Sequence, residues 1–291
     1  VSELIDMTSR GRASLKRISA LLDAPQDVAD RPDVQPLGEV RGDIEFRHLT
    51  FRYPDGEFDA LRDVSFTIRA GQRVGIVGRT GSGKTTVVDL ILRTCNVPDG
   101  TLFVDGHDVN TVPIRDVRQA AAYVPQDNFL FSDTIARNID FTENVPDRDR
   151  VSIAAVLADV DADVKDFPLG YDTVLGERGV TVSGGQKQRI SIARALIKDA
   201  PILILDDSVS AVDTQTERAI LDNLAKTRQG RTTILIAHRM STVEGMDQII
   251  FLEDGAVTAV GTHAQLCETC PAYRRMVELQ KLEEEGARHN G

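Results

Sequence analysis

A glycine-rich loop over residues 78–85 carries the residue types that bind phosphate groups. It fits the pattern G-x-x-x-x-G-K-[ST] and lies between an apolar, strand-sized run and an apolar helical stretch. Glycines allow backbone N–H groups to surround phosphate oxygens, and the start of the helix adds positive potential. Lys84 can reach the terminal phosphates, and the Thr85 hydroxyl can ligate Mg²⁺. In this context the loop predicts a nucleotide phosphate site rather than a simple turn.

Two adjacent carboxylates, Asp206 and Asp207, follow the apolar residues 202–205. A short apolar run of this kind is typical of a buried strand. We expect the end of this strand to present the carboxylates toward the same phosphates, with Asp206 holding Mg²⁺ through water. An apolar run that ends in two acids is a weak signal alone, but together with the phosphate loop it becomes a strong one.

A third motif covers residues 182–189, with the sequence Val-Ser-Gly-Gly-Gln-Lys-Gln-Arg. It directly precedes a helix predicted over 190–198, so the Ser183 hydroxyl and the following glycine amides would form a second anion site at a helix start. The motif resembles the signature sequence of ATP-binding cassette (ABC) ATPases, with Val182 in place of the usual leucine. In that family this site faces the γ-phosphate of ATP bound on the opposite subunit, so that two domains enclose two nucleotides head to tail.

Other positions strengthen this resemblance and imply further roles. Tyr53 matches the aromatic residue that stacks on adenine, and Gln126 matches the glutamine that contacts Mg²⁺ and relays to a membrane domain. Residues 210–213 match the loop that crosses the dimer interface, and His238 matches the switch histidine at the γ-phosphate. Alone, Tyr53 or His238 would more readily be structural, but seven motifs in family order between about 43 and 263 argue against coincidence.

The resemblance therefore implies a complete set of site residues for ATP and Mg²⁺. Those expected to act in hydrolysis are Lys84, Asp207 and His238, and those expected at the metal are Thr85, Gln126 and Asp206. The nucleotide site would comprise Tyr53, Gly78, Arg79, Thr80, Gly81, Ser82, Gly83, Lys84, Thr85, Thr86, Gln126, Asp206 and His238, completed in trans by Ser183, Gly184, Gly185 and Gln186 of a second cassette.

The elements that must position these residues follow an α/β pattern. Alternating apolar residues predict an N-terminal strand over 44–53, with a bulge between Phe46 and Leu49 where the phase changes, and a second strand over 64–68. Later strands alternate with helices, which indicates parallel pairing, while 127–198 is mostly helical. We expect a P-loop NTPase parallel sheet core with an N-terminal antiparallel β subdomain and an inserted helical (signature) subdomain.

The chain divides into four segments by composition. Residues 1–23 predict a helix that resembles the end of an exporter's last transmembrane helix, and 24–42 are a linker rich in Pro and Asp. The ABC ATPase domain is expected over 43–270, with its helical subdomain at about 127–198, and a charged helix and tail over 271–291. Because the chain opens with Val rather than Met, we expect it to be part of a longer polypeptide. Basic residues of the first helix favour a solvated face or, alternatively, contact with anionic headgroups.

Composition narrows the possible partners. The 291 residues include 34 Lys and Arg against 45 Asp and Glu, a net charge of −11 that makes nucleic acid a poor partner. No apolar run approaches the roughly 20 residues needed to cross a bilayer. Three cysteines are too few for a disulfide framework and indicate a reducing compartment. Cys267 and Cys270 form a C-x-x-C, but without a second pair we expect small residues near a helix start rather than a zinc site.

The segment Leu-Gly-Glu-Arg-Gly at 175–179 resembles the loop by which exporter cassettes meet their membrane domain. The resemblance thus implies a half-transporter at the cytoplasmic face of the cell (inner) membrane, with its own upstream transmembrane domain and a second ABC half-transporter as partners. Hydrolytic cassettes usually carry Glu at the position of Asp207, where it polarises the attacking water. An Asp there resembles the slow half of asymmetric bacterial exporters, so a heterodimer is favoured over a homodimer.

Two other functional classes remain open at this point. One is a nucleotide-gated clamp that binds ATP, closes and hardly hydrolyses it, which a measured turnover would distinguish from a competent enzyme. The other is a soluble cassette of DNA repair or translation, or an importer subunit. The short interval between Lys84 and Asp206 leaves no room for the long coiled coil of chromosome-type members. Residues 2–23 and the 175–179 segment disfavour an importer.

Overall fold

A six-stranded, mostly parallel sheet forms the centre of the chain. The computed structural model describes residues 2–24, 26–141, 145–176 and 181–289, and the strand order of this sheet is β10-β9-β3-β8-β7-β6. The hairpin partner β10 is antiparallel to β9, and the other neighbouring strands are parallel. The bounds are β3 (Arg73–Val77), β6 (Ala121–Val124), β7 (Ile202–Asp206), β8 (Thr232–Ile236), β9 (Gln248–Glu253) and β10 (Ala256–Gly261).

Alternate residues of these strands pack into two cores, one on each face of the sheet. In β8, Ile234 and Ile236 join one core and Leu235 joins the other, as the two-residue period of a strand requires. The first core is completed by a four-stranded antiparallel sheet of order β2-β1-β4-β5 and by two helices. Their bounds are β1 (Ile44–Phe51), β2 (Leu61–Ile68), β4 (Leu102–Val104), β5 (His107–Asp108), α2 (Lys84–Ile91) and α3 (Ile114–Ala120).

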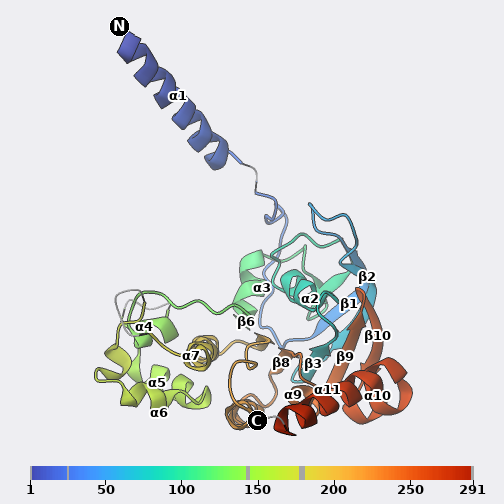
Figure 1. Cartoon of the computed structure of the whole chain (residues 1–291). Coiled ribbons are helices and arrows are strands. Elements are labelled where there is room, and N and C mark those ends of the chain that lie inside the picture. Colours follow the sequence, from blue (N-terminus) through green and yellow to red (C-terminus); the bar gives the residue numbers. More distant parts are fainter. Residues whose placement is uncertain (1, 25, 142–144, 177–180, 290–291) are drawn as a thin grey trace.

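Helices cover the second core, and four of them gather as a lobe at one side of the sheet (Figure 1). This lobe contains α4 (Ile135–Ile139), α5 (Arg148–Leu157), α6 (Asp161–Asp166) and α7 (Gly184–Leu196), with a 3₁₀ turn, η1 (Gly170–Asp172), between α6 and α7. The sheet domain also contains α8 (Thr214–Thr227), α9 (Met240–Val243), α10 (His263–Thr269) and α11 (Pro271–His289).

The predicted fold class is confirmed: an α/β fold with a parallel core, an antiparallel sheet and a helical lobe between β6 and β7. The bulge is also confirmed, since the β1–β2 register shifts between Phe46 and Leu49. The predicted helix over 190–198 was wrong in its start, because α7 begins at Gly184, within the signature motif itself. The short strands β4, β5 and β6 and the hairpin strand β10 were not predicted from the sequence.

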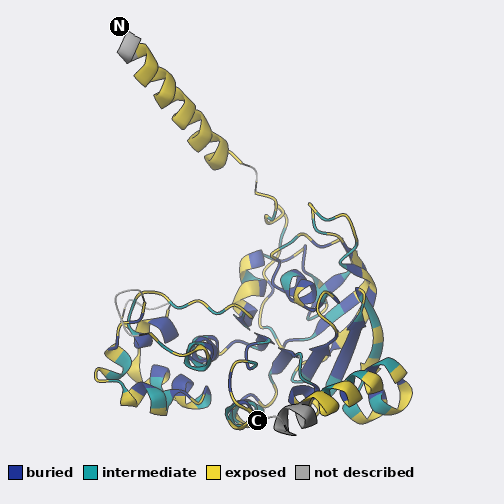
Figure 2. Ribbon diagram, in the orientation of Figure 1, coloured by how far each residue is buried: buried dark blue, intermediate teal, exposed yellow. Residues whose placement is uncertain are grey.

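The first helix, α1 (Ser2–Leu22), projects away from the sheet domain with its described side chains exposed (Figure 2). Among the described residues of 24–42 there is no helix or strand, yet this stretch is tied to the domain. Leu37 is buried, the Ile114 N–H donates to Asp30 at 2.7 Å, and the Gln35 N–H donates to the Thr111 carbonyl at 2.8 Å. None of the described helices is both long and apolar enough to cross a membrane.

The C-x-x-C residues lie at the junction of α10 and α11. Cys267 is on α10, with its sulfur 3.6 Å from His263 Nε2, and buried Cys270 directly precedes α11. Both thiols are free. In the part of the chain that the structure describes, no group of three or more His, Cys, Asp or Glu side chains is arranged to hold a metal ion.

Candidate nucleotide site

Four neighbouring parallel strands bring the predicted site residues to one edge of the sheet. The phosphate loop follows β3, His238 follows β8, Asp206 ends β7 and Gln126 follows β6. Crevices at the carboxyl ends of parallel strands are the usual ligand sites of open α/β sheets. Here they form a cavity of about 260 Å³, lined among others by Thr80, Gly81, Gly83, Lys84, Thr85, Thr86, Gln126, Asp206 and His238.

The phosphate loop lies so close to its surroundings that side chains are excluded at two positions. A Cβ at Gly78 would stand 2.2 Å from the Leu252 carbonyl oxygen, and one at Gly83 would stand 2.6 Å from Leu61 Cδ2. Gly83 also has a φ of 97°, which disfavours any other residue. The buried Ser82 hydroxyl has no hydrogen-bond partner among the residues that the structure describes. This tight loop with an unsatisfied hydroxyl fits the binding of a phosphate group.

Lys84 is buried at the base of this loop, with 5% of its surface exposed. Its ammonium donates to the carbonyl oxygens of Gly78 and Arg79, each at 2.9 Å. Burial lowers the pKa of Lys84, and the charges of Asp206 and Asp207 oppose that effect. The carboxylates therefore help to keep the amine protonated, as a phosphate-binding lysine must be.

Asp206 is the buried carboxylate of the site, with 2% exposure. Burial raises its pKa, and the hydroxyl of Tyr123 on β6 counters this by donating to Asp206 Oδ2 at 3.3 Å. Tyr123 was missed in the sequence, because strand β6 was not predicted; the register of the strand in the structure explains the contact. Tyr123 pairs with Ile204, two residues before Asp206, so both side chains lie on the same face of the sheet.

The donors at this edge fit Mg²⁺ rather than a softer metal. Thr85, Gln126 and Asp206 offer hydroxyl, amide and carboxylate oxygens, and all three line the same cavity. Mg²⁺ prefers oxygen ligands and is usually held by one or two carboxylates together with substrate phosphates. A single buried carboxylate beside a phosphate loop matches that pattern.

Tyr123→Phe is expected to raise the Mg²⁺ concentration that half-saturates ATP hydrolysis by about fivefold, because it removes one long hydrogen bond to the Asp206 carboxylate. The measurement is a Mg²⁺ titration at fixed ATP. Tyr171→Phe is the matched control, since its hydroxyl donates to Asp161 in the helical lobe. An unchanged half-saturation in Tyr123→Phe would contradict the assignment of Asp206 to the metal.

The backbone of Asp207 is fixed by hydrogen bonds at both its N–H and its carbonyl oxygen. Its N–H donates to the Ile236 carbonyl at 2.9 Å, and its carbonyl oxygen accepts from Ser210 Oγ at 2.8 Å and Gln188 Nε2 at 3.4 Å. Its φ of 45° is in the left-handed region, where Asp is tolerated better than most residues. The reach of the carboxylate is thus determined by the length of the side chain.

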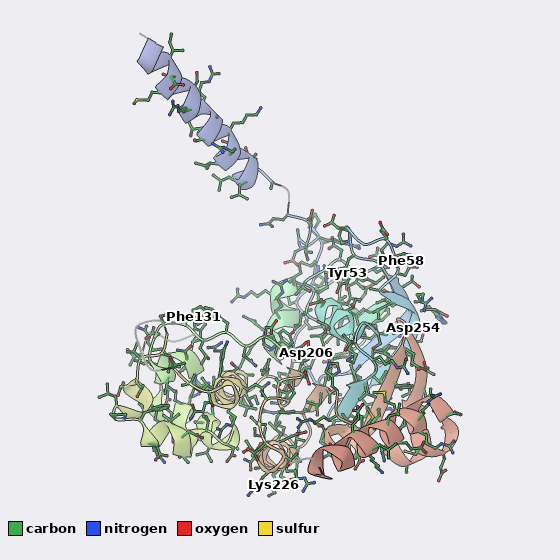
Figure 3. All side chains as sticks on the ribbon, viewed as in Figure 1. Tyr53, Phe58, Phe131, Asp206, Lys226 and Asp254 are labelled. Atoms are coloured by element: carbon green, nitrogen blue, oxygen red, sulfur yellow. The ribbon has the colours of Figure 1, made fainter. Side chains whose placement is uncertain are left out.

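Tyr53 is anchored on α2 beside the phosphate loop, and Figure 3 places it close to that helix. Its hydroxyl lies 2.9 Å from Asp89 Oδ2 and 3.1 Å from Thr86 Oγ1, and burial raises its pKa to about 12. Its ring packs edge-on against Phe51, with centroids 5.0 Å apart. Tyr53 is not among the residues that line the 260 Å³ cavity, so its stacking on adenine stays a prediction.

The signature residues do not line this cavity but form the start of α7 in the helical lobe. The Ser183 hydroxyl accepts from the Gln186 N–H at 3.2 Å, and the Gln186 side chain accepts from the Ser183 N–H at 3.0 Å, which is a capping box. A Cβ at Gly184 would meet nothing within 4 Å. In the exporter-like segment, Leu175 is buried, whereas residues 177–180 lie outside the described part of the chain.

Comparisons with known proteins agree with this geometry. The sequence model of the family described as "ABC transporter" matches residues 61–210, just over half of the chain. The chain is 43% identical over 290 residues to the probable multidrug resistance ABC transporter ATP-binding/permease protein YheI of Bacillus subtilis, covering 99% of this chain and 49% of the relative. It is 42% identical over 272 residues to an ATP-dependent lipid A-core flippase of Photorhabdus laumondii, covering 93% and 46%.

A solved structure is also similar to the chain. It is described as a bacterial Atm1-family ABC exporter with ATP bound, with a TM-score of 0.88 and 38% identity, covering 94% of this chain and 48% of that one. The chain thus spans about half the length of the relatives that it matches. From the phosphate loop, the buried Asp206, the signature helix and these matches it follows that the chain belongs to the ABC transporter family, as an ATP-binding domain of the exporter type.

Proposed function

We propose that the chain is the ATP-hydrolysing domain of an ABC exporter half-transporter, acting at the cytoplasmic face of the cell (inner) membrane. The observation that carries the proposal is the convergence of the phosphate loop, Gln126, Asp206 and His238 on one cavity. The relatives, which are about twice as long and include an ATP-binding/permease protein, support an upstream transmembrane domain in the whole protein.

ATP would be held by side chains and backbone amides that the fold already positions. Lys84 and the loop amides would bind the phosphates, Tyr53 would stack on the adenine, and His238 would contact the γ-phosphate. Thr85, Gln126 and Asp206 would hold Mg²⁺, which neutralises phosphate charge when bound. The burial of Lys84 and Asp206 supports these roles, because charge interactions are stronger where water is excluded.

The second half of each ATP site would come from another cassette in head-to-tail pairing. The capping box already occupies the Ser183 hydroxyl and the side-chain oxygen of Gln186. The amides of Gly184 and Gly185 then remain at the N-terminus of a 13-residue helix, which favours an anion. These amides lie in a lobe away from the chain's own phosphate loop, which supports the proposal that they bind a phosphate of the ATP held by the partner cassette.

The partner is proposed to be a different half-transporter. Asp207 stands where hydrolytic relatives of the family carry Glu, and its fixed backbone cannot advance the shorter side chain. The site built on this chain's phosphate loop would then be the slow one, while its signature completes the fast site of the partner. A clamp with negligible hydrolysis is the second candidate, and it rests on the same residue. A homodimer would be favoured instead if Asp207 proved an adequate base.

The upstream membrane domain is proposed to contact the helical lobe through an aromatic cluster. Phe129, Phe131 and Phe141 are exposed by 63%, 40% and 57%. The Phe131 and Phe141 rings stack with centroids 4.6 Å apart, and the Arg194 guanidinium lies over Phe131. Figure 3 shows Phe131 on the helical lobe, well apart from Asp206. Exposed aromatic residues gathered in this way are typical of an interaction surface.

Lys84→Ala is expected to weaken ATP binding by about 30-fold, because it removes a charged hydrogen bond to phosphate of about 2 kcal/mol. Equilibrium binding of ATP to the chain measures this. Lys226→Ala is the matched control, since Lys226 is exposed on α8 and Figure 3 shows it far from Asp206. Unchanged ATP binding in Lys84→Ala would contradict the proposed function. Thermal unfolding of both variants would show whether either substitution causes a general loss of structure.

A further inference from the structure

The side chain of Gln280 on α11 joins two backbone groups of the loop that carries His238. Its Nε2 donates to the His238 carbonyl oxygen, and its Oε1 accepts from the Met240 N–H at 2.7 Å. The two bonds lie on either side of Arg239. The amide of Gln280, 40 positions after Met240, therefore constrains the backbone of three consecutive residues. Both hydrogen-bonding ends of the amide are used.

The Met240 N–H needs such a partner because it begins the short helix α9. The first N–H groups of a helix lack partners within the helix and are usually satisfied by the N-cap side chain. Here the N-cap is Arg239, which makes no capping bond. Its guanidinium instead lies 3.4 Å from Glu217 Oε2 and 3.5 Å from the Ser210 carbonyl oxygen. Gln280 thus supplies the cap from outside.

The packing of α11 explains how Gln280 reaches this loop. Tyr273 and Val277 are buried, and Gln280 lies seven residues after the first and three after the second, on the same helical face. The Tyr273 ring packs edge-on against Phe251 of β9, with centroids 5.6 Å apart, and its hydroxyl lies 2.9 Å from His263 Nδ1. The buried tyrosine therefore fixes the helix, and the glutamine one turn beyond the buried face meets the loop.

His238 lies between two cavities. It lines both the 260 Å³ nucleotide cavity and a second cavity of about 1020 Å³ that separates the phosphate loop from α11. Because the larger cavity leaves space beside His238, the orientation of its imidazole depends on the backbone that carries it. The bond at the His238 carbonyl is a direct constraint on that backbone.

From these contacts we propose that Gln280 is a positioning residue for His238, through which the docking of α11 controls the hydrolysis step. The proposal rests on the proposed function in assigning His238 to the γ-phosphate. Gln280 itself is not among the residues that line the 260 Å³ nucleotide cavity. It orders the His238–Met240 backbone, so its loss should slow hydrolysis without weakening the binding of ATP.

Gln280→Met tests this by keeping the length of the side chain and removing both hydrogen bonds. The expected result is single-turnover hydrolysis of bound ATP that is about five- to tenfold slower, with the Kd for ATP unchanged within twofold. Amide exchange at Met240 should be at least tenfold faster, with exchange in the buried strand β8 unaltered. Single turnover is chosen because it can be measured even when the steady-state rate is low.

Two further variants sharpen the test. Gln280→Glu keeps an acceptor for the Met240 N–H but presents an oxygen to the His238 carbonyl, so it should keep Met240 protected while hydrolysis stays slow. Glu278→Gln is the control, because Glu278 is exposed on α11 about 200° around the helix from Gln280, and it should behave as the unsubstituted chain.

Faster exchange with an unchanged hydrolysis rate in Gln280→Met would reduce Gln280 to a structural role and overturn the proposal. Weaker ATP binding in proportion to the lost rate would also overturn it. A failure of the unsubstituted chain to bind ATP would instead reject the proposed function. The exchange measurement would still decide whether Gln280 orders the loop.

Discussion

Asp207→Glu is expected to hydrolyse ATP about 100-fold faster than the unsubstituted chain when each is assayed alone with Mg²⁺ at high protein concentration. The added methylene advances the carboxylate by about 1.5 Å, and misplacement of a reacting group by about 1 Å can cost about 100-fold in rate. The backbone cannot absorb this difference, because Asp207 is bonded to the Ile236 carbonyl and to Ser210 Oγ. Self-pairing supplies intact phosphate loops and signatures, so the length of this side chain is the only variable.

The same substitution is expected to lower the free energy of unfolding by up to about 1 kcal/mol. Asp207 has a φ of 45°, and the left-handed region costs most residues about 1–2 kcal/mol but Asp and Asn less. The gain in rate should therefore accompany a small loss of stability, measured by denaturant unfolding. A trade-off of this kind between rate and stability is typical of a position in an active site.

Asp207→Asn is the matched control, because it keeps the length and the backbone preference but removes the charge. It should remain as slow as the unsubstituted chain and as stable. If the unsubstituted chain already turns over at about 1 s⁻¹ or faster, within the usual enzyme range, Asp207 is an adequate base. The slow-site assignment, and with it the heterodimer, would then lose its main support.

The sheet core was predictable because two of its strands are short apolar runs followed by recognisable site residues. The run before Gly78 and the run before Asp206 became β3 and β7, and their parallel pairing through β8 placed the loop and the carboxylate at one edge. The signature helix was harder, because its first residues are glycines with low helix propensity. Its capping box, Ser183 with Gln186 three residues later, was the signal that could have corrected the start.

The contacts that tune the site were beyond the sequence, because they join residues far apart in the chain. Tyr123 reaches Asp206 across 83 positions, and Gln280 reaches His238 across 42. Local periodicity predicts that Tyr273, Val277 and Gln280 share a helical face, but not what that face covers. Only the path of α11 over β9 decides that Gln280 meets the His238 loop.

Gly184→Ala is expected to weaken ATP-dependent pairing of the chain by more than 100-fold while leaving its own fold intact. Within the chain a Cβ at this position meets nothing within 4 Å, so no internal contact requires glycine. Glycine would be required if a phosphate approached the backbone closely. Each charged hydrogen bond lost is worth about 1.5–3 kcal/mol, and a head-to-tail pair loses it at both sites, which gives the expected factor.

Sedimentation of the chain with and without ATP measures this effect, since pairing needs no turnover. Gly11→Ala is the matched control: Gly11 lies within α1, and a Cβ there also meets nothing within 4 Å. Both substitutions replace a helical glycine, so both should leave unfolding unchanged or slightly strengthen the fold. Only Gly184→Ala should prevent pairing. Equal pairing in the two variants would mean that no partner phosphate approaches α7, and the head-to-tail arrangement would have to be abandoned.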